Sequence, residues 1–139
     1  MVTFERCLKE GLLKQIPASP VESKNQIEKA EVILGESKSC LENGDLNASV
    51  MTAYAALFDA SRSLLFRDGY RERSHVCAVR YLESKYIKEL GEDTIVLLDE
   101  YREKRHKVVY ASDFYPTEEE AKNILHFAEK FIGKIKKLL

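Results

Sequence analysis

The stretch that decides the fold is TEEEAKNILHFAEKFIGKIKKL, residues 117–138. Thr117 and Glu120 have the spacing of a capping box, which indicates that a helix begins here. The apolar residues that follow recur in alternating steps of three and four, as on one face of an α-helix. They are Ala121, Ile124, Ala128, Phe131, Ile135 and Leu138. The stretch therefore predicts an amphipathic helix with one face turned to a core.

The same spacing recurs upstream, in segments separated by Gly44, Gly69 and Gly91 within a stretch that contains no proline. Helices are expected near residues 4–14, 20–43, 46–68, 74–90, 94–110 and 117–138, with no strand. Short connections favour antiparallel neighbours. The predicted fold is all-α, an antiparallel up-and-down bundle of four to five helices. It occupies about residues 20–138, behind a short N-terminal helix, in a single domain covering residues 1–139.

Composition excludes several classes of protein. The chain has 139 residues, and 22 Lys and Arg against 23 Asp and Glu give a formal net charge of −1, which excludes a uniformly basic nucleic-acid coat. No apolar run approaches the ~18 residues of a membrane span. The charged N-terminal segment is unlike a secretory signal, so a cytoplasmic location is expected. Cys7, Cys40 and Cys77 have no paired spacing and are expected to be free thiols. No metal-binding motif occurs, and neither a metal nor a cofactor is expected.

Candidate chemistry lies in TIVLLDEYREKRHKVVY, residues 94–110. Arg102 and His106 lie one helical turn apart, where the guanidinium can bind a phosphate and the imidazole can transfer a proton. In metal-free RNA cleavage, His106 would take or give the proton at the 2′-oxygen or the leaving oxygen, while Arg102 stabilises the phosphorane. Arg105, Lys107 and Tyr110 would contact the substrate. The alternative is a solvated cationic end of a helix, favoured by the helix dipole.

Two further features bear on binding and assembly. Arg73 and His75, at the start of helix 74–90, could extend a phosphate-binding surface, although an exposed basic loop is the favoured explanation. Helix 94–110 carries a second apolar strip formed by Ile95, Leu98 and Val109, beside its core-facing arc. A helix that is apolar on two sides packs against two neighbours, here its own bundle and a second subunit. We therefore expect a homodimer.

Several segments resemble the small stand-alone HEPN proteins of prokaryotes. They are AYAALFDASRSLL at 53–65, Asp68-Gly69-Tyr70, Ser74-His75 and YREKRHKVVY at 101–110, and the resemblance covers roughly residues 20–138. It implies an antiparallel helical bundle that usually dimerises and acts in nucleotide or RNA biology. Many such domains are metal-independent endoribonucleases, some of them toxins encoded beside a minimal nucleotidyltransferase. Others are non-catalytic nucleotide-binding or protein-interaction modules.

The nuclease motif of that family is Arg, four to six residues, then His. Here three residues separate Arg102 from His106, a spacing that still places both on one helical face. In members paired with a nucleotidyltransferase, a tyrosine shortly after the histidine can be modified, and Tyr110 follows His106 by four residues. Three functions stay open: an RNA-cleaving toxin, a non-catalytic module that binds nucleotides or a partner, and a structural dimer.

Overall fold

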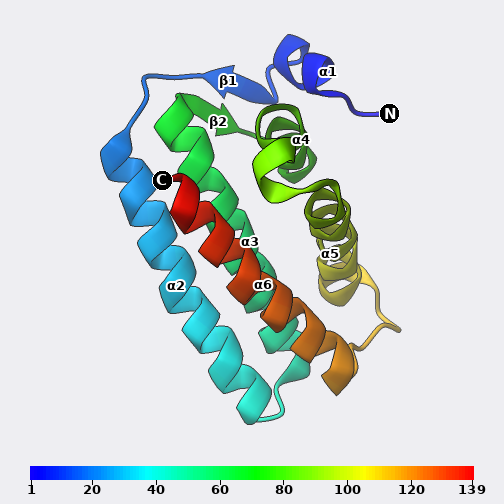
Figure 1. Ribbon diagram of the computed structural model, residues 1–139. Coiled ribbons are helices and arrows are strands. Elements are labelled where there is room, and N and C mark those ends of the chain that lie inside the picture. The colour runs from blue at the N-terminus through cyan, green and yellow to red at the C-terminus, as the bar shows by residue number, and fades with distance from the viewer.

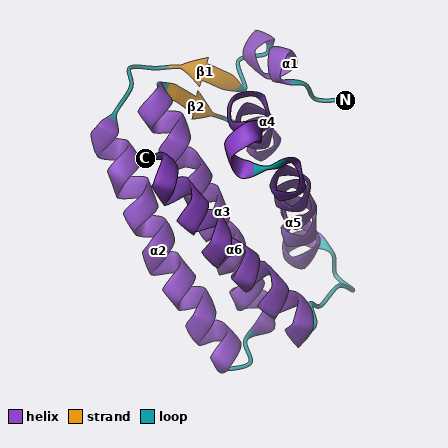
Figure 2. Cartoon of the chain, viewed as in Figure 1, coloured by secondary structure: helices purple, strands orange, loops and turns teal.

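The computed structural model describes residues 1–139 and confirms an all-α fold (Figure 1). Five long or medium helices follow one short helix, and two three-residue strands complete the chain (Figure 2). The elements are α1 Phe4–Lys9, β1 Leu13–Gln15, α2 Pro20–Glu42, α3 Leu46–Asp68, β2 Tyr70–Glu72, α4 His75–Leu90, α5 Glu92–Tyr110 and α6 Glu118–Leu138. No helix is both long and apolar enough to cross a membrane.

Helix α3 is the centre of the bundle, since it contacts α2, α6, α5, α4 and β2 (Figure 1). Its sequence allows this because Ala53, Ala56 and Ala60 are fully buried and let neighbouring helices approach closely. A buried hydroxyl pair joins α2 to α3: Ser37 Oγ donates to the Ser49 carbonyl at 2.7 Å, and Ser49 Oγ donates to the Ser37 carbonyl at 3.0 Å. The apolar face predicted for residues 117–138 is buried against this helix and α2.

The N-terminal segment differs from the prediction. The helix expected over 4–14 ends at Lys9, and residues 13–15 pair with β2 as an antiparallel ribbon, so the prediction of no strand is wrong. Gly11 adopts a φ of 71°, which reverses the chain after α1. Leu13 is then only 1% exposed. A three-residue strand carries no readable alternation, so this pairing depends on tertiary contacts.

Gly69 links the end of α3 to this ribbon. Its φ is 88°, the left-handed conformation that ends helices, and a Cβ here would lie 2.8 Å from the Ile16 carbonyl oxygen. The close approach of the two backbone segments allows a hydrogen bond, in which the Ile16 amide donates to the Gly69 carbonyl at 2.9 Å. Glycine is therefore required by both conformation and space.

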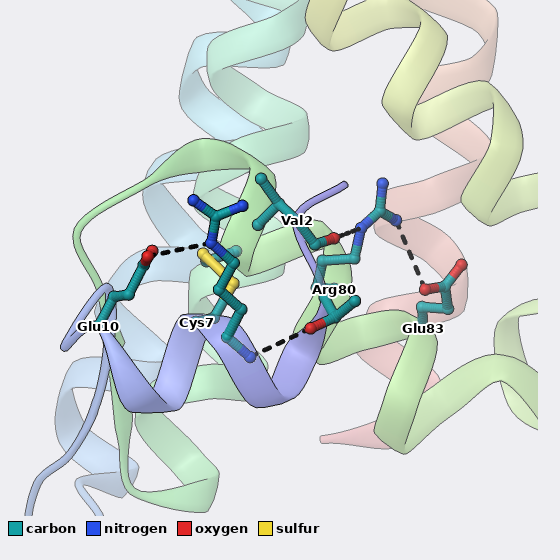
Figure 3. The surroundings of a disulfide bond; sticks show 8 residues. Val2, Cys7, Glu10, Arg80 and Glu83 are labelled. Carbon is teal, nitrogen blue, oxygen red and sulfur yellow. Dashed lines mark hydrogen bonds and ion pairs between the residues drawn. A yellow bond between two sulfur atoms is a disulfide. The ribbon is translucent and has the colours of Figure 1, made fainter.

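A disulfide joins Cys7 of α1 to Cys77 of α4 (Figure 3). The expectation of three free thiols is wrong for this pair, and only Cys40 is free. The two residues are 70 positions apart in the sequence, so their spacing gives no sign of the bond. They meet because the β1–β2 ribbon folds the N-terminal segment back over the start of α4.

Candidate functional site

The second half of α5 fixes Arg102 through a shared carboxylate. Arg102 Nε lies 2.9 Å from Asp99 Oδ1, one turn earlier on the same helix. The other oxygen, Asp99 Oδ2, lies 3.2 Å from an Arg80 guanidinium nitrogen of α4. All three side chains are less than a third exposed, so these contacts are only partly screened by solvent. Asp99 therefore orients Arg102 and ties α5 to α4.

Arg80 connects this pair to the N-terminal segment. Its Nε donates to the Val2 carbonyl at 3.1 Å, and another of its guanidinium nitrogens lies 3.5 Å from Glu83 Oε1. Figure 3 shows Arg80 between Val2 and Glu83, next to the disulfide that holds α1 on α4. The position of Arg102 thus depends on contacts that reach back to the first residues of the chain.

His106 is exposed on the turn that follows Arg102. Its ring lies against Tyr110, with a centroid distance of 4.7 Å, and neither side chain forms a hydrogen bond or ion pair. Lys107 is also exposed and unpaired. Lys104, by contrast, lies 2.7 Å from Glu120 Oε2 and joins α5 to α6. Arg102 is therefore held by an ion pair. The side chains of His106, Lys107 and Tyr110 are exposed and unpaired, so a ligand could contact them.

A second group of side chains forms where α3, α4 and α5 meet. His75 Nδ1 lies 3.1 Å from the Tyr54 hydroxyl, and the His75 ring stacks on Phe58 with a centroid distance of 3.9 Å. The Arg105 guanidinium lies over the Tyr54 ring, 5.7 Å from its centroid. The structure thus brings together two predicted residues, His75 and Arg105, which are 30 positions apart in the sequence. Tyr54 and Phe58 are not among the predicted site residues, because aromatic residues inside an apolar helix are typical of a core.

The two hydrogen-bonded rings have pKa values displaced in opposite directions. Burial lowers the pKa of His75, and the nearby charges of Arg105, Arg102 and Arg62 lower it further. Burial raises the pKa of Tyr54 to about 12, although Arg102 and Arg105 act in the opposite sense. At neutral pH, therefore, Tyr54 is a phenol and His75 is a neutral imidazole. One hydrogen bond between the Tyr54 hydroxyl and His75 Nδ1 therefore joins two uncharged groups.

Arg73 is not brought into either group. Its side chain is exposed and makes no ion pair or hydrogen bond. Its backbone amide donates to the Leu12 carbonyl at 2.8 Å, which extends the β1–β2 ribbon. Nowhere in the chain do three His, Cys, Asp or Glu side chains gather in a way that could hold a metal ion.

The second apolar strip predicted on α5 has a different role from the one expected. Ile95 and Leu98 are each only 3% exposed and belong to the protein's own core, so they offer nothing to a second subunit. The aliphatic residues that α5 does expose are Val96, at 50%, and Leu97, at 37%. The predicted homodimer stays a prediction, and burial of Ile95 and Leu98 removes two of the three apolar residues on which it was based.

Comparison with known proteins agrees with this architecture. The model of the HEPN domain family matches residues 23–138. A protein of Methanocaldococcus jannaschii named "Putative toxin MJ0605" is 31% identical over 115 residues, which cover 81% of this chain and 85% of that protein. The matched region contains all the helices of the bundle from α2 to α6 except the first three residues of α2. The chain therefore belongs to the HEPN family.

Proposed function

We propose that this protein is a single-domain HEPN toxin that cleaves RNA without a metal ion, with Arg102 and His106 as its catalytic pair. The observation that carries the proposal is the contrast between these two residues on one face of α5. Arg102 is fixed by Asp99 at 2.9 Å, whereas His106 is exposed and unpaired one turn away. A fixed cation beside a free imidazole suits phosphate binding and proton transfer. The similarity to the M. jannaschii toxin supports the same proposal.

In the proposed reaction, His106 removes the proton from a ribose 2′-hydroxyl, and the oxygen attacks the adjacent phosphorus. Arg102 stabilises the negative charge that grows on the phosphorane. The bond to the 5′-oxygen then breaks and that oxygen takes a proton from an imidazolium, leaving a 2′,3′-cyclic phosphate and a 5′-hydroxyl. A homodimer would supply a second His106 for one of the two proton transfers. Lys107 and Tyr110 would contact the RNA beside the reacting phosphate.

The test is incubation of the purified protein with total RNA in excess EDTA. We expect cleavage by the wild type, and a loss of at least about a hundredfold in His106→Ala and Arg102→Ala, the range of general acid–base and electrostatic contributions. Lys137→Ala is the matched control, because Lys137 is an exposed cation of α6 that makes no ion pair. An RNA analogue with 2′-O-methyl groups should resist cleavage. Cleavage that persists in His106→Ala would refute the catalytic assignment.

A non-catalytic module is the second candidate, and one observation favours it. Arg102 already has a carboxylate partner in Asp99, and its distance from His106 is one residue shorter than the family's nuclease motif. Such a module would bind nucleotides or dock a minimal nucleotidyltransferase instead of cleaving RNA. Calorimetry with nucleotides and co-purification with that partner test it. If RNA stays intact while a nucleotide or the partner binds, this second function is supported over the first.

A further inference from the structure

A groove with a volume of about 350 Å³ lies between α5 and α6, which diverge from the loop at residues 111–117 that joins them (Figure 1). Helix α5 packs mainly against α4 and α3, so its contact with α6 is made largely by side chains. Near the loop, the ion pair of Lys104 and Glu120 holds the two helices together. Farther along, the groove opens between them, and its volume is in the range of sites for small organic molecules.

The apolar part of the lining is mostly aromatic. Leu97 and Tyr101 contribute to it from α5, one turn apart, and Phe127 and Phe131 contribute from α6. The Tyr101 and Phe127 rings are tilted by 45° with centroids 5.1 Å apart, and the Phe127 and Phe131 rings stack with centroids 6.0 Å apart. Leu97 is 37% exposed, and Tyr101 and Phe127 are half-buried, so solvent reaches this surface. Three rings in a row favour tilted or offset contacts with a further ring.

The cationic part of the lining comes from α6. Lys130 is exposed and forms no hydrogen bond or ion pair. Lys134 Nζ donates to the Leu90 carbonyl at 3.1 Å and to the Thr94 hydroxyl at 2.9 Å, and both of these acceptors are uncharged. An ammonium group has three donors, so one donor of Lys134 remains. Lys134 is therefore a positioned cation without a counter-ion.

The one carboxylate that lines the groove does not neutralise these lysines. Asp93 is exposed in the first turn of α5, where the helix dipole favours a negative charge, and it forms no ion pair with Lys130 or Lys134. The groove thus carries two positive side chains against one negative side chain. Lys130 and Lys134 are one turn apart on α6, so a single carboxylate can accept charge-assisted hydrogen bonds from both.

We propose that the groove between α5 and α6 binds a small aromatic carboxylate, with its ring against the aromatic side chains and its charge at Lys130 and Lys134. The excess of one positive charge favours a singly charged acid over a doubly charged phosphate. None of the lining residues belongs to the proposed catalytic pair. The ligand is therefore additional to an RNA substrate, and the inference does not depend on RNA cleavage.

Calorimetry on the full chain tests the role of the charge, with indole-3-propionate as the probe. Its amide, acetate and inorganic phosphate are the comparison ligands. We expect the acid to bind about ten times more tightly than the amide, because a charge-assisted contact adds to burial of the ring. Acetate and phosphate should bind much more weakly than the acid, because neither has a ring. Equal binding of acid and amide would overturn the proposal, as would acetate or phosphate that binds as tightly as the acid.

Lys130→Met should remove most of the preference for the acid over the amide. Lys130 is exposed, so the substitution should leave the fold intact. Lys137→Met is the matched control, because Lys137 is an exposed, unpaired cation of the same helix that does not line the groove. An unchanged preference in Lys130→Met would count decisively against the site.

Leu97→Asp tests the apolar lining and places a negative charge inside the groove. We expect it to weaken binding of the acid at least about tenfold, through lost apolar contact and charge repulsion. Val96→Asp is the matched control, since Val96 is the neighbouring residue, is 50% exposed and does not line the groove. Equal affinities of the two variants for the acid would refute the location.

His126 reports the location in the wild type. It lines the groove, whereas His75 and His106, the other two histidines of the chain, do not. Addition of indole-3-propionate should therefore shift the imidazole resonances of His126 in NMR spectra and leave those of the other two unchanged. If the His126 resonances stay in place under saturating acid, the ligand does not occupy this groove and the proposal fails.

Two other occupants are distinguished in the same series. Self-association that is abolished by Leu97→Asp but not by Val96→Asp, in a protein that does not bind the acid, would assign the groove to a second copy of the chain and overturn the proposal. A glycine-rich tetrapeptide ending in tryptophan presents the same ring and carboxylate at the end of a chain. If it binds at least about ten times more tightly than the free acid, the occupant is a protein terminus and the small-molecule assignment is wrong.

Discussion

At the scale of single residues, the structure assigns two protonation states that the sequence could not. His75 is held neutral and Tyr54 is held as a phenol, because both are buried to a large extent and share one hydrogen bond of 3.1 Å. His106, by contrast, is exposed on α5. Two histidines that look equivalent in the sequence therefore have different surroundings: His75 is packed against Tyr54 and Phe58, whereas His106 faces solvent.

The lowered pKa of His75 predicts a dependence of stability on pH. In the unfolded chain this imidazole takes up a proton near its ordinary pKa of 6.5, whereas the folded protein takes it up only at lower pH. The unfolded state therefore binds more protons between those two pKa values. The contribution is present above pH 6.5 and is lost as the pH falls through the folded pKa. Urea unfolding of wild type and His75→Asn between about pH 4 and pH 8 measures it, and parallel curves would contradict the prediction.

The pKa of His75 itself can be followed by NMR titration. Burial is the largest cause of the shift and the charge of Arg105 comes next, so Arg105→Gln should raise the pKa partway toward its ordinary value. Arg71→Gln, which removes an exposed charge on β2, should leave the pKa of His75 unchanged. Equal titration of His75 in all three proteins would mean that Arg105 does not face this ring.

At the scale of elements, the N-terminal segment is fastened to α4 at several points. The disulfide, the Arg80 contact with the Val2 carbonyl and the β1–β2 ribbon all act on residues 2–15. Arg80 connects this segment to α5, because Arg80 and Arg102 both pair with Asp99. The N-terminal segment, which lies outside the bundle, is therefore connected through Arg80 to the ion pair between α4 and α5.

Reduction of the disulfide should destabilise the fold and free this segment. Closing a loop of 70 residues removes enough entropy from the unfolded chain to stabilise the native state by about 4 kcal/mol in the chain-entropy model. Urea unfolding with and without reductant, in a Cys40→Ser background that prevents exchange, measures the difference. Amide exchange should rise first in residues 4–15. Equal midpoints for the oxidised and reduced protein would count against the prediction.

Asp99→Asn tests the contact between α4 and α5. Loss of the carboxylate leaves two partly buried guanidinium groups without their anion, and we expect a cost of about 1–3 kcal/mol in the free energy of unfolding. Glu103→Gln is the control. Its carboxylate lies 3.8 Å from Arg102 and is largely exposed, so its removal should change stability by less than about 0.5 kcal/mol. Similar effects of the two substitutions would show that Asp99 is no more than a surface ion pair.

At the scale of the whole molecule, one connected apolar cluster joins α2 to α6 and includes Leu13 of the ribbon. Phe131 of α6 is among its largest fully buried side chains. Phe131→Ala should therefore cost about 3–5 kcal/mol, through lost burial and the cavity left behind. Val32→Ala, on the exposed side of α2, should stay within about 0.5 kcal/mol. Thermal and urea unfolding compare the two, and a cost below about 1 kcal/mol for Phe131→Ala would contradict its place in the core.

The helices are predicted well from the sequence because their signals are local. Capping residues, glycines and the three–four spacing act within a few positions, so the predicted limits of α2 to α6 lie within two residues of those observed. The same local spacing places Arg102 and His106 one turn apart on a helix. Local signals fail for the N-terminal segment, where residues 13–15 form a strand only because β2, more than fifty residues later, lies beside them.

What the sequence determined by itself is therefore an all-α HEPN bundle with a cationic turn near the end of α5. Only the tertiary structure decided that Cys7 bonds to Cys77, that Asp99 joins Arg102 to Arg80, and that His75 stands against Phe58 beside Arg105. These contacts bring together residues from different elements, and their formation depends on how the helices pack. Helical periodicity records which face of each helix is buried, but it does not record which side chains of other helices meet that face.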